Sequence, residues 1–191
     1  MSQRLAPGLC LALLALLLSA CGFRLMGDRP LPELLDVVFI DVEAPYRVRE
    51  PPVETHLRAL LQRRGASIRT RSGDGVTAVR IQELNTVREV LSVGPDGKAL
   101  EFLLRTTVRY RVERDGTVLV PSDYLEISRD FSFNADQVLA KDAEEARLRA
   151  YLQTELAELI LIRLEARLGG LPAPAPAVVP AVLAPANAPG A

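Results

Sequence analysis

Cys21 is the residue best placed to do chemistry in this chain. It follows the tripeptide Leu-Ser-Ala (18–20), which closes an apolar run of mainly Leu and Ala from Leu9 to Leu18, after the basic Arg4. A basic N-terminal region, an apolar core and small residues before the cleavage site are typical of a secretory signal peptide. The run is too short for a membrane span, which needs about 20 apolar residues. The motif resembles the bacterial lipobox, whose cysteine thiol is diacylated; the alternative is an ordinary signal peptide with a chance cysteine.

The lipobox predicts how the mature chain is anchored. Residues 1–20 would be removed as a lipoprotein signal peptide, and Cys21 would become the lipidated N-terminus. One acyl chain holds a protein only marginally to a bilayer, whereas two or more hold it stably. Gly22, and not Asp, follows the cysteine, which in bacterial lipoproteins favours the outer membrane over retention at the inner one. We therefore expect a lipid-anchored protein of the cell outer membrane, on its periplasmic side.

The rest of the chain offers few catalytic residues. His56 is the only histidine, and it precedes the apolar Leu57 in a predicted helix, where a boundary position is the better interpretation. The mature chain would keep one cysteine, the lipidated one, which leaves no free thiol and no disulfide. The paired acids Glu144 and Glu145 are expected to be solvated in the first turn of a helix. We predict no enzyme activity, no metal and no cofactor; a periplasmic hydrolase that uses His56 is a competing hypothesis.

A row of arginines could bind an anionic ligand. Three arginines lie on the same face of a predicted strand: Arg105, Arg109 and Arg111. Residues two positions apart in a strand are separated by about 6.6 Å. Two more could join them from the strand before: Arg80 and Arg88. Guanidinium groups bind phosphate and carboxylate bidentately. The pattern alone favours the alternative, a solvated face with cross-strand ion pairs to three acids: Glu89, Glu113 and Glu126. The net charge of −1 argues against a nucleic-acid partner.

The strands that must position these arginines follow from hydrophobic periodicity. The run from Phe102 to Glu113 alternates apolar residues with mainly charged ones, which predicts a half-buried strand. Tight turns are predicted on both sides of it, at 94–97 and at Asp115-Gly116. With strands at 84–93 and 125–133 they make an antiparallel meander. Earlier strands are predicted at three places, the last two around a turn at 72–75: Val37–Val42, 66–70 and 76–81.

Two helices are predicted to cover this sheet. The first begins after Pro51-Pro52, since proline suits a helix start, and it places Val53, Leu57, Leu60 and Leu61 at helical spacing. The second begins at Asn134 or Asp136 and ends before Gly169-Gly170. Its apolar stripe recurs every four residues and is widened by Leu159 and Ile162; the stripe is Leu148, Leu152, Leu156, Ile160, Leu164 and Leu168.

The order β-α-β-β-β-α predicts an α+β fold. We expect a two-layer sandwich, in which a single, mainly antiparallel sheet packs against two helices. This domain is assigned to residues 21–170. The remaining residues, 171–191, are rich in Pro and Ala, so this tail is predicted to be disordered.

Four short motifs, taken in order, resemble the family of the LPS-assembly lipoprotein LptE. They are the lipidated start at 21–25, the turn and strand start at 97–102, the segment 129–133 and the helix start at 138–145. The resemblance covers most of residues 21–168 and leaves out the Pro/Ala tail. It implies a small, non-enzymatic α+β lipoprotein that plugs the outer-membrane β-barrel LptD and helps that barrel to assemble. It also implies a part in placing lipopolysaccharide in the outer leaflet, and direct binding of lipopolysaccharide.

The resemblance further implies contact residues for lipopolysaccharide. Lys141 matches a family lysine implicated in this binding; the alternative is a first-turn helix lysine that pairs with Asp142 or Glu145. The family's second basic residue lies in the turn before the long strand, where this chain has no matching arginine, and Lys98 is the nearest substitute. Because lipopolysaccharide carries phosphates, Arg105, Arg109 and Arg111 are further candidates. The alternative function is a generic envelope scaffold that binds peptidoglycan or another envelope protein.

Overall fold

The helices and strands follow the predicted order. The computed structural model describes residues 30–43, 49–133 and 138–171. All its elements belong to a compact unit that begins at Leu31. In chain order they are η1 (Glu33–Leu35), β1 (Val37–Val42), α2 (Pro52–Arg63), β2 (Ser67–Arg69), β3 (Thr77–Val93), β4 (Ala99–Arg114), β5 (Thr117–Ser132) and α3 (Val138–Leu168). The predicted signal peptide, Cys21, the start of the second helix at 134–136 and the tail from residue 172 lie outside the described residues.

The five strands form one sheet in the order β2-β1-β3-β4-β5. β1 pairs in parallel with β2 and β3 over short registers, whereas β3, β4 and β5 pair antiparallel along most of their length. The sheet is therefore mainly antiparallel, as predicted, and α2 supplies the crossover that parallel strands require. The predicted turn at 72–75 joins two strands that do not pair with each other, because β1 lies between them.

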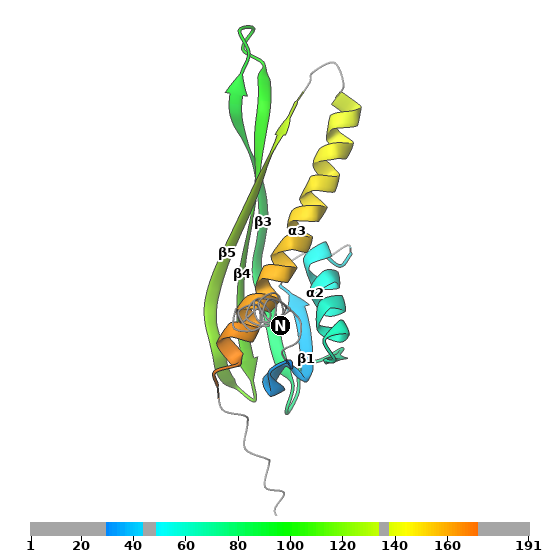
Figure 1. Cartoon of the computed structure of the whole chain (residues 1–191), viewed down its shortest axis with the longest axis vertical. Coiled ribbons are helices and arrows are strands. Elements are labelled where there is room, and N and C mark those ends of the chain that lie inside the picture. The colour runs from blue at the N-terminus through cyan, green and yellow to red at the C-terminus, as the bar shows by residue number, and fades with distance from the viewer. Residues whose placement is uncertain (1–29, 44–48, 134–137, 172–191) are drawn as a thin grey trace, which may run out of the picture. The chain divides into compact units, whose positions relative to one another are not determined.

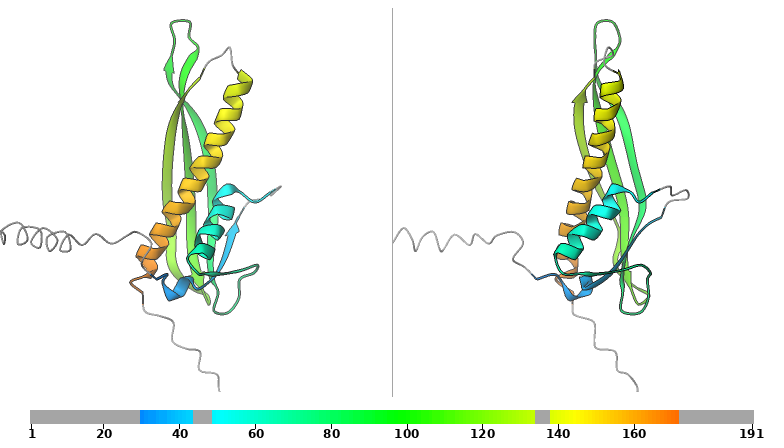
Figure 2. Two further views of the ribbon diagram at one scale, coloured as in Figure 1. Left: turned by 45° about the vertical axis from the view of Figure 1, so that its right-hand side comes forward. Right: turned by 90° about the vertical axis from the view of Figure 1, so that its right-hand side faces the viewer.

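Both helices cover one face of the sheet (Figure 1; Figure 2) and enclose the apolar core with it. On β4 the buried residues alternate from Phe102 to Val112, as a side-chain period of two predicts. α2 begins at Pro52 and buries Val53, Leu57 and Leu61 on one stripe. The predicted α+β sandwich of one sheet and two helices is confirmed. The sheet face away from the helices is called the outer face below.

The apolar stripe of α3 was predicted correctly along its length, but the residues that widen it differ from the predicted ones. Leu152 through Leu168 are buried at every fourth residue. Leu159 and Ile162, predicted to widen this stripe, are 37% and 52% exposed, so that prediction is wrong. Ala157 and Leu161 are buried instead. The reason is that α2 packs against the flank of α3 that carries Leu161, while the flank with Leu159 has no helix beside it among the described residues.

β3 is one strand where the sequence predicted two. It runs without a break through residues 82 and 83, but its register with β4 shifts between Ile81 and Glu83. Such a bulge adds one residue to one strand, so residues beyond it change the face to which they point. No helix of the described part is long and apolar enough to span a membrane.

Candidate functional site

The arginine row of β4 lies on the outer face, and every member has a carboxylate partner. Arg105 lies 3.1 Å from Glu89 and 3.6 Å from Glu126, on the two neighbouring strands. Arg109 pairs with Glu83 at 3.1 Å, and Arg111 pairs with Glu113 at 2.7 Å. The predicted alternative, a face of cross-strand ion pairs, is confirmed for Glu89, for Glu126 and, through Arg80 of β3, for Glu113, which also pairs with Arg111 along its own strand.

Arg80 of β3 completes this set of ion pairs. Its Nε lies 2.6 Å from Glu113, whose other oxygen accepts a bond from Arg111. The hydrogen bond from Arg80 is the main reason that the pKa of Glu113 lies below its usual value. Ion pairs on the outer face thus join four arginines to four glutamates: Arg80, Arg105, Arg109 and Arg111 to Glu83, Glu89, Glu113 and Glu126. It is a charge-paired surface and not a free cationic one.

Arg88 was predicted to join the same face, and this is wrong. Because the bulge precedes it, Arg88 is paired in register with the buried Leu104 and points toward α3. Its guanidinium lies 4.6 Å from the ring centre of Phe102 and donates a hydrogen bond of 2.8 Å to Glu145 of α3. No residue pattern near Ile81 and Glu83 predicts this bulge.

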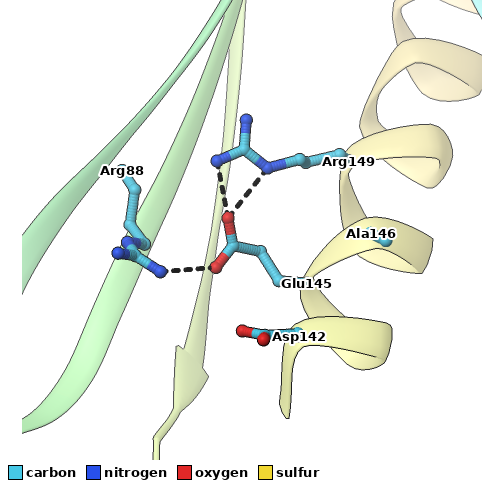
Figure 3. A pocket seen from close by; sticks show the side chains of 5 residues that line it. All are labelled: Arg88, Asp142, Glu145, Ala146 and Arg149. Atoms are coloured by element: carbon cyan, nitrogen blue, oxygen red, sulfur yellow. Dashed lines mark hydrogen bonds and ion pairs between the residues drawn. The ribbon is translucent and has the colours of Figure 1, made fainter. Parts of the chain in front are cut away.

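Glu145 is held between two guanidinium groups at the edge of a hollow of about 290 Å³. Figure 3 shows Arg88 approaching from β3 and Arg149 from the next turn of α3. Arg149 donates two hydrogen bonds, of 2.9 and 2.5 Å, to the other oxygen of Glu145. Burial opposes ionisation of this carboxyl, but the bonds from Arg149 and Arg88 outweigh it and lower its pKa. Glu145 is therefore a bridge between sheet and helix, and the expectation that it is solvated is wrong.

The two lysines lie in different elements at the same end of the unit (Figure 1). Lys98 lies at the tip of the β3–β4 hairpin, where its side chain is 68% exposed and 3.3 Å from Asp96. Lys141 lies in the first turn of α3 with its side chain 15% exposed, and its Nζ is 2.7 Å from Glu144. Asp142 and Glu145 were the expected partners, but Glu145 is already occupied by arginines. The Lys98 side chain is thus largely exposed, whereas most of the Lys141 side chain is covered.

A polar junction at Asp123 was missed by the sequence analysis. Asp123 of β5 accepts a hydrogen bond of 3.1 Å from the hydroxyl of the buried Tyr110. Arg163 and Arg167 of α3 approach the same carboxylate at 3.6 and 3.0 Å. Burial raises the pKa of Tyr110, so its hydroxyl stays protonated and donates. The spacing of the two arginines, four residues apart on a helix, was the available signal, but their partner is set by packing.

His56 occupies the boundary position that was predicted. It lies on α2, half-buried against α3, with its Nε2 3.5 Å from Glu158. Within the described ranges no three His, Cys, Asp or Glu residues gather as metal ligands would. Cys21 lies outside these ranges, so its lipidation stays a prediction.

Comparison with known proteins places this geometry in a family. The family model "LptE: Lipopolysaccharide-assembly" matches residues 37–164. The LPS-assembly lipoprotein LptE of Pectobacterium atrosepticum is 28% identical over 156 residues, which cover 82% of this chain and 83% of that protein. The protein of the same name from Photorhabdus laumondii is 27% identical over 157 residues, with the same coverage.

Solved structures show the same fold. A minor lipoprotein from Acinetobacter baumannii matches with a TM-score of 0.57 and 22% identity, over 69% of this chain and 92% of that one. Lipoprotein B from Nitrosomonas europaea matches with a TM-score of 0.59 and 22% identity, over 78% and 94%. Since the family model covers well over half of the sequence, this chain belongs to the LptE family of non-enzymatic lipopolysaccharide-assembly lipoproteins.

Proposed function

We propose that this chain is anchored at the outer membrane through Cys21 and occupies the lumen of an LptD-like β-barrel. There it helps the barrel to assemble and helps lipopolysaccharide to reach the outer leaflet. In doing so it binds lipopolysaccharide directly. The observation that carries the proposal is the charge-paired outer face of the sheet. The lumen of a large outer-membrane barrel is polar, and a charged surface whose arginines are each paired with a carboxylate suits contact with such a lumen.

Lys141 and Lys98 are the proposed first contacts for the phosphates of lipopolysaccharide. Each ammonium group has one carboxylate partner, Glu144 or Asp96, at the surface. Surface ion pairs of this kind are worth about 0–1 kcal/mol, so a phosphate of higher charge can replace the carboxylate at little cost. Both lysines lie at one end of the unit, which suits a large ligand with several phosphates.

Arg105, Arg109 and Arg111 are proposed as secondary contacts. Their guanidinium groups already bind carboxylates, and a phosphate would have to exchange with those partners. Binding at this row is therefore expected to be weaker than at the two lysines, because the released glutamates must be solvated again.

Co-purification with the barrel tests the plug directly. The full chain, tagged at its C-terminus, is co-expressed with the LptD-like barrel of the same organism and extracted in detergent. We expect a stable complex of one copy of each protein. Recovery of this chain alone would overturn the plug, and retention on peptidoglycan in the same extract would favour the envelope scaffold.

Lipid anchoring is tested with a matched pair of cysteine variants. Incorporation of labelled palmitate is expected in the parent and in Cys10→Ala, whose cysteine lies within the predicted signal peptide. Cys21→Ala should incorporate none and should leave the membrane fraction. Labelling of Cys21→Ala at the parent level would remove Cys21 as the acylated residue.

A further inference from the structure

We propose that the free edge of β5, together with the adjoining flank of α3, is a docking site for one extended loop segment of the barrel partner. This inference rests on the proposed function, because that function supplies the partner. It concerns a surface that neither the lysines nor the outer-face arginines occupy.

The edge of β5 is long and has an unpaired backbone. β5 is the last strand of the sheet and pairs with β4 on one side, and no described residue pairs with its other side. Exposed edges usually carry Pro, charged side chains or bulges that hinder the addition of a strand. β5 has Pro121 beside a register irregularity, whereas the ten residues from Asp123 to Ser132 contain charged residues of both signs but no Pro, Gly or Lys. Their outward backbone groups are a template for another strand.

The flank of α3 beside this edge carries an exposed apolar side chain. Glu155 bonds Arg129 of β5 at 3.1 Å, and Arg163 approaches Asp123 of β5 at 3.6 Å. Leu159 lies one helical turn from both Glu155 and Arg163, so it lies on the same flank. Leu159 is 37% exposed, and α3 crosses the sheet beside β5 in Figure 2. A strand added to β5 would cover Leu159 with its inward side chains.

The positive charge of Arg163 and Arg167 indicates what kind of segment could bind beside β5. Arg163 and Arg167 share a single carboxylate, that of Asp123, and both are about half exposed. One positive charge is therefore left over beside Leu159. The fitting partner is an extended segment with apolar residues at alternate positions and an acidic residue opposite the two arginines. A helix would satisfy the arginines but not the backbone groups of β5.

Amide hydrogen exchange in the purified complex with the barrel tests this site. Amides of β5 that point away from β4 should exchange quickly in the free chain and at least about ten-fold more slowly in the complex, at alternate positions between Asp123 and Ser132. A complex in which these amides exchange as fast as in the free chain would overturn the docking site and leave the plug standing. Failure to form any complex would overturn both.

A pair of exposed-residue variants gives a second readout. Leu159→Asp places a charge on the docking flank, and it should abolish the protection of β5 in the complex. Val90→Asp places the same charge on another exposed apolar residue, on the hairpin, at 54% against 37% exposure, and should leave the protection unchanged. Circular dichroism of both variants checks that the fold is intact. Equal protection in Leu159→Asp and the parent would overturn the role of the flank.

Discussion

Arg80 and Arg88 lie on the same strand at an even spacing, yet they bind carboxylates on opposite faces of the sheet. Arg80 bonds Glu113 on the outer face, and Arg88 bonds Glu145 of α3 on the helix-covered face. The register shift between Ile81 and Glu83 is the cause, because it reverses the faces of the residues from Glu83 to Val90, after which the register shifts again. This one bulge removes a cation from the outer face and supplies a bridge between sheet and helix.

Glu145→Gln is expected to lower the free energy of unfolding by about 1–3 kcal/mol. The change leaves Arg88 and Arg149 facing a neutral amide in a half-buried place. Urea denaturation followed by circular dichroism measures the effect. The control is Glu144→Gln, whose exposed ion pair with Lys141 should be worth about 0.5 kcal/mol or less. Equal costs for the two variants would contradict the bridging role.

The free energy of unfolding should fall in acid, because Glu113 and Glu145 become protonated and lose their ion pairs. Both carboxyls have a pKa below the ordinary glutamate value in the folded chain. The unfolded chain therefore binds more protons near that value, about 4.3, and folding loses free energy as the pH falls from there through the folded pKa. Urea midpoints of the parent and of Glu113→Gln/Glu145→Gln, taken from pH 7 to pH 3, should converge on acidification. A gap that stays constant with pH would contradict this linkage.

Asp123→Asn should cost about 2–3 kcal/mol, and Tyr110→Phe about 1 kcal/mol. The first change removes the charge that holds Arg163, Arg167 and the Tyr110 hydroxyl together, whereas the second removes one hydrogen bond. Thermal and urea unfolding measure both. Asp130→Asn, at an exposed position of the same strand, serves as the control with no measurable cost expected. A Tyr110→Phe cost as large as that of Asp123→Asn would mean that the arginines contribute nothing.

Lys141→Asp should weaken lipopolysaccharide binding by about ten-fold or more and leave association with the barrel unchanged. The change reverses the charge that faces the ligand, while an acid in the first turn of a helix is favourable to the helix dipole. Fraying of α3 would therefore not account for the loss. Binding is measured by surface capture of lipopolysaccharide, with Arg147→Asp, an equal charge change at an exposed position of α3, as the control. Equal binding by Lys141→Asp and the parent would remove Lys141 from the site.

Glu83→Gln tests whether the outer-face arginines reach the ligand. The change releases Arg109 from its only ion pair among the described residues, so lipopolysaccharide should bind about 1.5- to 5-fold more tightly. Glu101→Gln removes the same charge from the same face but frees no arginine, since Glu101 accepts a bond from Ser92. If both variants gain equally, the effect is one of net charge and Arg109 makes no contact.

Several features of this protein follow from local sequence pattern alone. The alternation along β4, the fourfold stripe of α3 and the turns at 94–97 and Asp115-Gly116 depend on neighbours within a few residues, and each was predicted where the structure has it. The three arginines of β4 were placed on one face for the same reason. The α+β class and the family resemblance rest on these same segments.

The other features of the fold and of the candidate site depend on packing between segments that are distant in the sequence. The bulge in β3 is set by its pairing with β4, and the exposed flank of α3 by the position of α2, so neither Arg88 nor Leu159 could be placed from its own neighbours. Arg88 and Glu145 are 57 residues apart in sequence. A sequence states which residues alternate along one element; only the tertiary structure decides which charge on another element each of them meets, because ion pairs across elements depend on register and helix placement.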